Sequence, residues 1–175
     1  MSAQPYKYTF EESSKVGDVG LMAVINWLQQ KEETIEVRSV VADPQWQALD
    51  IDLLWTVSMG GVSKVCTVEV KADRYFRTGN YFIETESNSY KGTQGCLLYS
   101  QAICLVYLFV PEMEAHIIKL PLFRDWFLKN IDRFPEKGTS TKVGASGYTS
   151  KGRLVPRSIV ADEVGVQVVN IGGTP

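Results

Sequence analysis

Apolar and polar residues alternate along several short stretches of the chain, and this pattern is typical of β-strands with one buried face. The stretches that show it, or that form an apolar run of strand length, are 34–40, 50–58, 62–71, 81–86, 102–110 and 115–120. A Gly60-Gly61 turn separates the second stretch from the third, so these two are predicted to pair as a hairpin. The last two stretches are separated by only a few residues and are predicted to form another hairpin.

Helical spacing appears in three segments. Apolar residues within 14–30 recur at intervals of three and four, which predicts a helix with Ser13 or Ser14 as its cap. A short helix is expected at 95–100, and Pro121 has the position of a first-turn proline at the start of a third helix. This order of elements predicts an α/β fold, in which a mixed central β-sheet is flanked by helices.

The C-terminal part of the chain carries a weaker pattern. Segment 138–152 is rich in Gly, Ser, Thr and Lys and is predicted to be a mobile loop, followed by two short edge strands. We therefore expect one domain over 1–175, with its core at about 10–134 and a loop-rich extension at 135–175.

Composition narrows the class of protein. The chain has 175 residues, of which 45% are hydrophobic and 22% are charged, as in an ordinary globular domain. No apolar run reaches the roughly 18 residues of a membrane span, and the N-terminus lacks the pattern of a signal peptide. The three cysteines have no CxxC spacing, which favours reduced thiols and a cytoplasmic location. The single histidine argues against a zinc site of the usual kind.

Charged residues interrupt two of the apolar strands. Glu69 and Lys71 lie two apart in a strand, so they project from the same face. Asp50 and Asp52 belong to the preceding strand and come near that pair if the hairpin forms. Two carboxylates and an ammonium would then converge, an arrangement that binds a hard divalent cation and stabilises developing negative charge. Alternatively, Asp52 is a strand-entry residue and the other two form an exposed pair worth little energy.

Asp52 followed by Glu69-Val70-Lys71 on a neighbouring strand resembles the PD-(D/E)XK phosphodiesterase superfamily, which includes restriction endonucleases and Holliday junction resolvases. Segments 78–84 and 100–102 are similar to a pattern in small phage-type members, and the resemblance covers about residues 10 to 130. The chain departs from the family where the proline of the motif is missing. It also has Ile103 where those members often carry an acid.

The resemblance implies a role for each residue of the motif. Asp52 and Glu69 would be carboxylate ligands of a metal ion, normally Mg²⁺ with Mn²⁺ as a substitute, and the Val70 carbonyl would be a backbone ligand. Lys71 would position the attacking water and offset the charge of the phosphate. Two carboxylates and a carbonyl are sufficient protein ligands, because Mg²⁺ keeps several of its waters.

The remaining acids receive weaker roles. Asp18 is either a helix residue favoured by the helix dipole or a further acid of the catalytic site that reaches across to the sheet. Glu84 and Glu86 are expected to be solvated or to support the site from outside. Asp50 and Asp73 are expected to be loop residues in supporting positions.

Contacts to DNA require cations and polar groups around the metal. The candidates are Arg74, Arg77, Asn80, Lys91 and Ser100 near the predicted pocket, and Lys151 and Arg153 in the C-terminal extension. Plain surface charge is the alternative for about half of these residues. The sequence thus predicts a Mg²⁺-dependent DNA endonuclease acting as a homodimer. It would be structure-selective, like a Holliday junction resolvase, or of a restriction or homing type. The alternative is a nucleic-acid-binding or interaction protein on the same fold that does not cleave.

Overall fold

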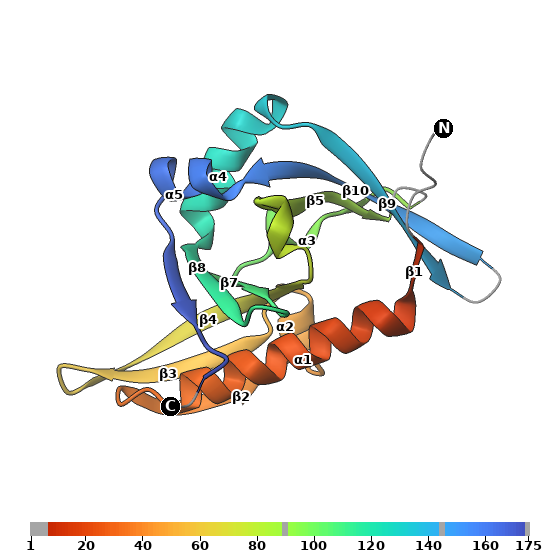
Figure 1. Ribbon diagram of the computed structural model, residues 1–175. Helices are drawn as coiled ribbons and strands as arrows, with labels where there is room; N and C mark the ends of the chain where they lie inside the picture. Colours follow the sequence, from red (N-terminus) through yellow and green to blue (C-terminus); the bar gives the residue numbers. More distant parts are fainter. Residues whose placement is uncertain (1–6, 89–90, 144–145, 174–175) are drawn as a thin grey trace.

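The structure is a computed structural model that describes residues 7–88, 91–143 and 146–173, and its largest feature is a six-stranded sheet (Figure 1). The strand order is β11–β8–β7–β4–β3–β2. The strands are β2 (Thr34–Ser39), β3 (Leu53–Met59), β4 (Val62–Asp73), β7 (Cys104–Phe109), β8 (Glu114–Lys119) and β11 (Gln167–Asn170). Only β4 and β7 pair in parallel, so the sheet is mixed. The predicted α/β class and both predicted hairpins, β3–β4 and β7–β8, are confirmed.

A second, five-stranded sheet lies above the first in Figure 1 and was not predicted. Its strands, in spatial order, are β1 (Lys7–Thr9), β9 (Glu136–Val143), β10 (Ser146–Pro156), β5 (Asn80–Asn88) and β6 (Thr93–Gln94). The loop predicted at 138–152 is wrong, because all of it except residues 144–145, which lie outside the description, belongs to β9 and β10. The side chains of β9 are exposed or half-buried, so the strand lacks the apolar alternation that would have revealed it.

The helices are α1 (Phe10–Gln29), α2 (Pro44–Gln47), α3 (Cys96–Tyr99), α4 (Leu120–Asn130) and α5 (Arg157–Glu163), with 3₁₀ turns at Phe76–Thr78 and Ile131–Arg133. The predicted start of α1 is wrong by one turn. Thr9 is the cap, since its hydroxyl accepts from the Glu12 N–H while the Glu12 carboxylate accepts from the Thr9 N–H. None of the described helices is long and apolar enough to cross a membrane.

The two faces of the six-stranded sheet carry two different hydrophobic clusters. Helix α1 packs on one face, where Val24 and Leu28 meet Val68 and other aliphatic residues. The opposite face holds the larger cluster, in which Tyr107 of β7 packs against Tyr81 of β5 and residues of α4. Because side chains alternate along a strand, the residues of β4 on either side of Val68 point into the space between the two sheets.

The contact between α1 and β4 leaves no room for a side chain at Gly20. A Cβ there would lie 2.6 Å from the Ala72 Cβ, whereas a Cβ at Gly17, one turn earlier, would meet nothing within 4 Å. We expect Gly20→Ala to lower the free energy of unfolding by about 1–3 kcal/mol through overpacking. The matched variant Gly17→Ala should raise it by about 0.5–1 kcal/mol through helix propensity. Urea unfolding of both variants checks this, and equal effects at the two positions would contradict the described packing.

Candidate metal centre

Strand β4 presents Glu69 and Lys71 to the space between the sheets. Val68 and Ala72 pack toward α1, so the intervening odd-numbered residues project from the other face. Glu69 is only 6% exposed, and its Oε2 has no hydrogen-bond partner among the residues that the structure describes. The Lys71 Nζ lies 3.6 Å from the Glu84 Oε2 on β5. The predicted side-by-side placement of Glu69 and Lys71 is therefore present.

Asp50 lies in the turn before β3, because that strand begins at Leu53 and not at the predicted residue 50. Its backbone is held in the left-handed region with a φ of 53°. This conformation is uncommon outside glycine, although aspartate tolerates it better than most residues, and in folded proteins such strain clusters at functional sites. The Ser100 hydroxyl donates to the Asp50 carbonyl at 2.7 Å, and the Asp50 N–H donates to the Gln47 carbonyl at 3.0 Å.

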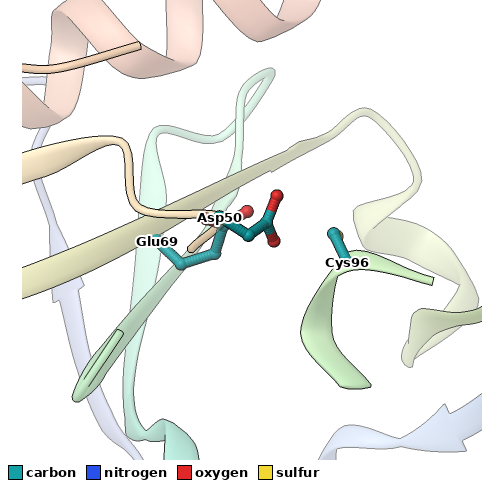
Figure 2. A group of neighbouring side chains, drawn as sticks. All are labelled: Asp50, Glu69 and Cys96. Carbon is teal, nitrogen blue, oxygen red and sulfur yellow. The ribbon is translucent and has the colours of Figure 1, made fainter. Parts of the chain in front are cut away.

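The side chain of Asp50 meets two residues of α3. The Tyr99 hydroxyl donates to Oδ1 of Asp50 at 3.3 Å, whereas Oδ2 is buried and has no partner among the described residues. A carboxylate oxygen of Asp50, one of Glu69 and the Sγ of Cys96 all lie within 4.8 Å of one another. Figure 2 shows Asp50 and Cys96 facing each other from different segments, with Glu69 beside Asp50. Three potential ligand atoms therefore converge on one point.

Asp52 lies beside this group and binds the backbone. Its Oδ2 accepts a hydrogen bond of 2.8 Å from the Val70 N–H. Val68 is the last β4 residue that pairs with β3. Val70 lies two residues beyond it, so the Val70 peptide is just past the end of the β3–β4 ladder. The structure thus brings Asp52, Glu69, Val70 and Lys71 together as expected. It places Asp50, and not Asp52, in the group of three converging ligand atoms.

Burial and mutual repulsion perturb the carboxylates. Burial, followed by the charge of Asp52, raises the pKa of Asp50 to about 6. Burial also raises the pKa of Glu69 well above its usual range, and Asp52 and Asp50 raise it further. Burial lowers the pKa of the Lys71 ammonium, but Glu84 and other nearby groups outweigh this effect and raise it overall. Acids that repel one another and retain unbonded buried oxygens have perturbed pKa values of the kind found at functional sites, so this group is a candidate for binding a cation.

Three residues that carry the geometry were not singled out from the sequence. Cys96 opens α3, where burial raises the pKa of its thiol to about 12. Gly95 lets that helix approach β5, because a Cβ there would lie 1.9 Å from the Glu84 carbonyl oxygen. Arg124 of α4 donates to the carbonyls of Leu97 and Ser100 and so fixes both ends of α3. The sequence predicted only the short helix around Cys96. A cysteine in an apolar segment gives no sign that its thiol lies beside carboxylates.

Asp18 is not brought to this centre, which corrects its expected place among the catalytic acids. It lies on α1, which covers the opposite face of the six-stranded sheet from Glu69. There it is exposed and lines a hollow of about 560 Å³ with residues such as Met22 and Met113. The sheet itself separates Asp18 from the converging carboxylates.

Two of the expected DNA contacts, one buried and one half-buried, have hydrogen-bond partners within the protein. Ser100 is fully buried. Its hydroxyl donates to the Asp50 carbonyl and accepts from the Ala102 N–H at 3.2 Å. Arg153 is 22% exposed, donates to the Phe134 carbonyl at 2.9 Å and pairs with Glu136 at 3.6 Å. Neither side chain is free to contact a phosphate in this structure, so both expectations are corrected.

The other expected DNA contacts are nearer to the surface. Arg77 and Lys91 are exposed, whereas Lys151 is 42% exposed and lies 3.6 Å from Glu86. The Arg74 guanidinium donates to the Glu12 carbonyl of α1 at 3.1 Å, and the Asn80 amide donates to the Thr78 carbonyl at 2.9 Å. Among the expected DNA contacts, Arg77, Lys91 and Lys151 are therefore the exposed cations.

The perturbed carboxylates predict an unusual dependence of stability on pH. The folded-state pKa of Asp50 is about 6 and the unfolded value is about 4. The folded protein therefore binds this proton more tightly, and the resulting stabilisation is complete below the unfolded pKa and lost as pH rises through 6. We expect the ion-free protein to gain stability relative to Asp50→Asn as pH falls from 7 to 4. Thermal unfolding at stepped pH measures this, and a difference independent of pH would contradict it.

Comparison of the chain with family models, with curated proteins and with solved structures gave no match to any of them. The resemblance to the PD-(D/E)XK superfamily therefore rests on the sequence motif alone.

Proposed function

We propose that the protein is a Mg²⁺-dependent DNA endonuclease with a restriction endonuclease-like fold and a PD-(D/E)XK centre. One observation carries the proposal. The carboxylates of half-buried Asp50 and buried Glu69 converge, each with one buried oxygen that has no hydrogen-bond partner among the described residues, and Lys71 projects from the same face of β4 as Glu69. Acids with raised pKa values and unbonded buried oxygens are characteristic of functional sites, and this supports the proposal that the group binds a cation.

The chemistry of the donors fits a hard divalent cation. Asp50 and Glu69 would supply one oxygen each, with Asp52 beside them, and the Val70 carbonyl lies at the same end of the β3 ladder. Mg²⁺ is satisfied by few protein oxygens because it retains several waters. When bound, the ion polarises the scissile phosphate and activates a water molecule for attack.

Lys71 has the position of an electrostatic and orienting group. Its ammonium stays charged at neutral pH, because Glu84 and the other acids around it raise its pKa. A charged ammonium cannot accept the proton of the attacking water. We therefore propose that Lys71 offsets the negative charge of the phosphate and orients the attacking water. Its ion pair with Glu84 at 3.6 Å would hold it between β4 and β5 until the substrate arrives.

The proposed substrate is DNA that is recognised by its structure more than by a long sequence. The exposed cations among the expected contacts, Arg77, Lys91 and Lys151, are suited to phosphate contacts. Cutting both strands of a duplex or a junction requires two centres, so we propose that the enzyme acts as a homodimer. Mn²⁺ is expected to replace Mg²⁺, because both prefer oxygen ligands.

The test incubates the purified protein with supercoiled circular, linear and four-way-junction DNA in the presence of Mg²⁺ or Mn²⁺. We expect cleavage of circular or branched DNA that depends on the ion and is lost in Asp50→Asn. Asp125→Asn, an exposed acid on α4, is the matched control and should cleave as the wild type does. Cleavage that survives Asp50→Asn would overturn the proposal. Binding of DNA without cleavage of any substrate would support the alternative of a non-cleaving binding protein.

A further inference from the structure

The converging group contains a sulfur atom as well as oxygens. The Cys96 Sγ is within 4.8 Å of ligand oxygens of Asp50 and Glu69. Glu69 is an independent sign that the group binds a ligand. The residue is only 6% exposed, and its Oε2 has no hydrogen-bond partner among the described residues. Gly95 and Arg124 hold α3 in the position that brings the thiol to the carboxylates. The thiol is therefore placed by the fold and is not an incidental surface cysteine.

A thiolate changes which cations a carboxylate pair prefers. Mg²⁺ binds oxygen and gains nothing from sulfur. Zn²⁺ and Cd²⁺ are softer, and a set of two carboxylates and one thiolate provides three of the four ligands of a tetrahedral zinc site. Binding would break the S–H bond and form the metal–sulfur bond, and the proton would leave to solvent.

We propose that Asp50, Glu69 and Cys96 bind a thiophilic divalent cation, of which Zn²⁺ is the example, in competition with Mg²⁺ and so as an inhibitor of cleavage. The proposal rests on the metal centre of the proposed function but does not depend on DNA being the substrate. A softer ion held by all three side chains would occupy the two carboxylates that Mg²⁺ needs and would so exclude Mg²⁺. The centre would then respond to the ratio of the two ions.

The decisive measurement uses the metal alone. Co²⁺ is added to the ion-free full-length protein, and a cobalt–thiolate charge-transfer absorption is expected in the wild type and not in Cys96→Ser. Competition by Zn²⁺ gives its affinity, which we expect Cys96→Ser to lower by at least about tenfold. Mg²⁺ affinity, followed by the thermal shift that the ion produces, should change by less than about threefold because sulfur is not its ligand. Cys96→Ala repeats the test if the serine variant does not fold.

Cys66→Ser is the matched control. Cys66 lies on β4, as Glu69 does, but it belongs to the cluster that packs against α1 on the other face of the sheet. It should keep the cobalt absorption and the zinc affinity of the wild type. Loss of either signal in Cys66→Ser, or equal zinc affinity in the wild type and Cys96→Ser, would overturn the proposal.

The outcomes also separate this inference from the proposed function. If Mg²⁺ supports cleavage and Zn²⁺ does not inhibit it or contact sulfur, only the inference on Cys96 fails. If Zn²⁺ binds through Cys96 but no DNA is cleaved with Mg²⁺, the nuclease proposal fails and the metal centre stands. If neither ion binds, both fail.

Discussion

Glu69→Gln should abolish cleavage and, at the same time, make the ion-free protein more stable. The variant removes a carboxylate proposed as a metal ligand, and we expect cleavage to fall by roughly 10³-fold or more. It also replaces a buried acid whose charged form is disfavoured by burial and by the charges of Asp52 and Asp50, which together raise its pKa. The amide of glutamine can donate to those carboxylates, so the free energy of unfolding should rise by about 1–3 kcal/mol.

Thermal unfolding with and without Mg²⁺ measures both halves of this expectation. The wild type should be stabilised by the ion, whereas Glu69→Gln should start higher and gain little. Glu33→Gln is a suitable control, because this exposed residue should change neither stability nor cleavage. A Glu69→Gln protein that is less stable than the wild type without ion would show that the Glu69 carboxyl is stabilised within the protein, by its hydrogen bond with Asp52 or by another contact. It would then count against the reading of Glu69 as a ligand.

Lys71→Met should lower cleavage by about 10²–10³-fold while Mg²⁺ still stabilises the protein. Methionine keeps the length and the apolar stem of the side chain but removes the ammonium. The ion pair with Glu84 is only partly buried, with side-chain exposures of 26% and 20%, so its loss should cost little stability. Lys64→Met, which lies on the same strand in an exposed position, is the matched control.

Cleavage and the thermal shift from Mg²⁺, measured together, show whether Lys71 acts in the cleavage reaction or in metal binding. If Lys71→Met loses the thermal shift from Mg²⁺ together with cleavage, then the lysine supports the metal centre and not the phosphate. If it cleaves as well as Lys64→Met does, the proposed catalytic role is wrong. A single-turnover cleavage rate at saturating Mg²⁺ is the quantity that decides.

The sequence predicted the strands that alternate and failed on those that do not. The hairpin across Gly60-Gly61 and the β7–β8 hairpin carry apolar residues on a buried face, and this periodicity is visible without a structure. The β9–β10 hairpin runs through Gly, Ser, Thr and Lys and has little burial on β9. Strand β9 pairs through its backbone with β1 and β10, and backbone pairing leaves no mark on the order of side chains.

The candidate centre was predictable where it follows from strand alternation. Glu69 and Lys71 are two residues apart within β4, and residues at that spacing in a strand point to the same face of the sheet. The same rule was applied to Asp50 and Asp52, but β3 begins at Leu53, so the position of Asp50 depends on a left-handed turn instead. Asp18 shows another limit, because helical spacing gives the buried side of a helix but not the face of the sheet that the helix covers.

The left-handed backbone at Asp50 restricts how this protein could change in evolution. If a descendant no longer needed the ligand, glycine or asparagine would be favoured at residue 50, because these residues tolerate a φ of 53°. Residue 69 would instead drift toward an apolar side chain, since it is buried in a strand. The two positions would therefore lose their acids in different ways, and a lineage that has lost the metal would be recognisable from that contrast.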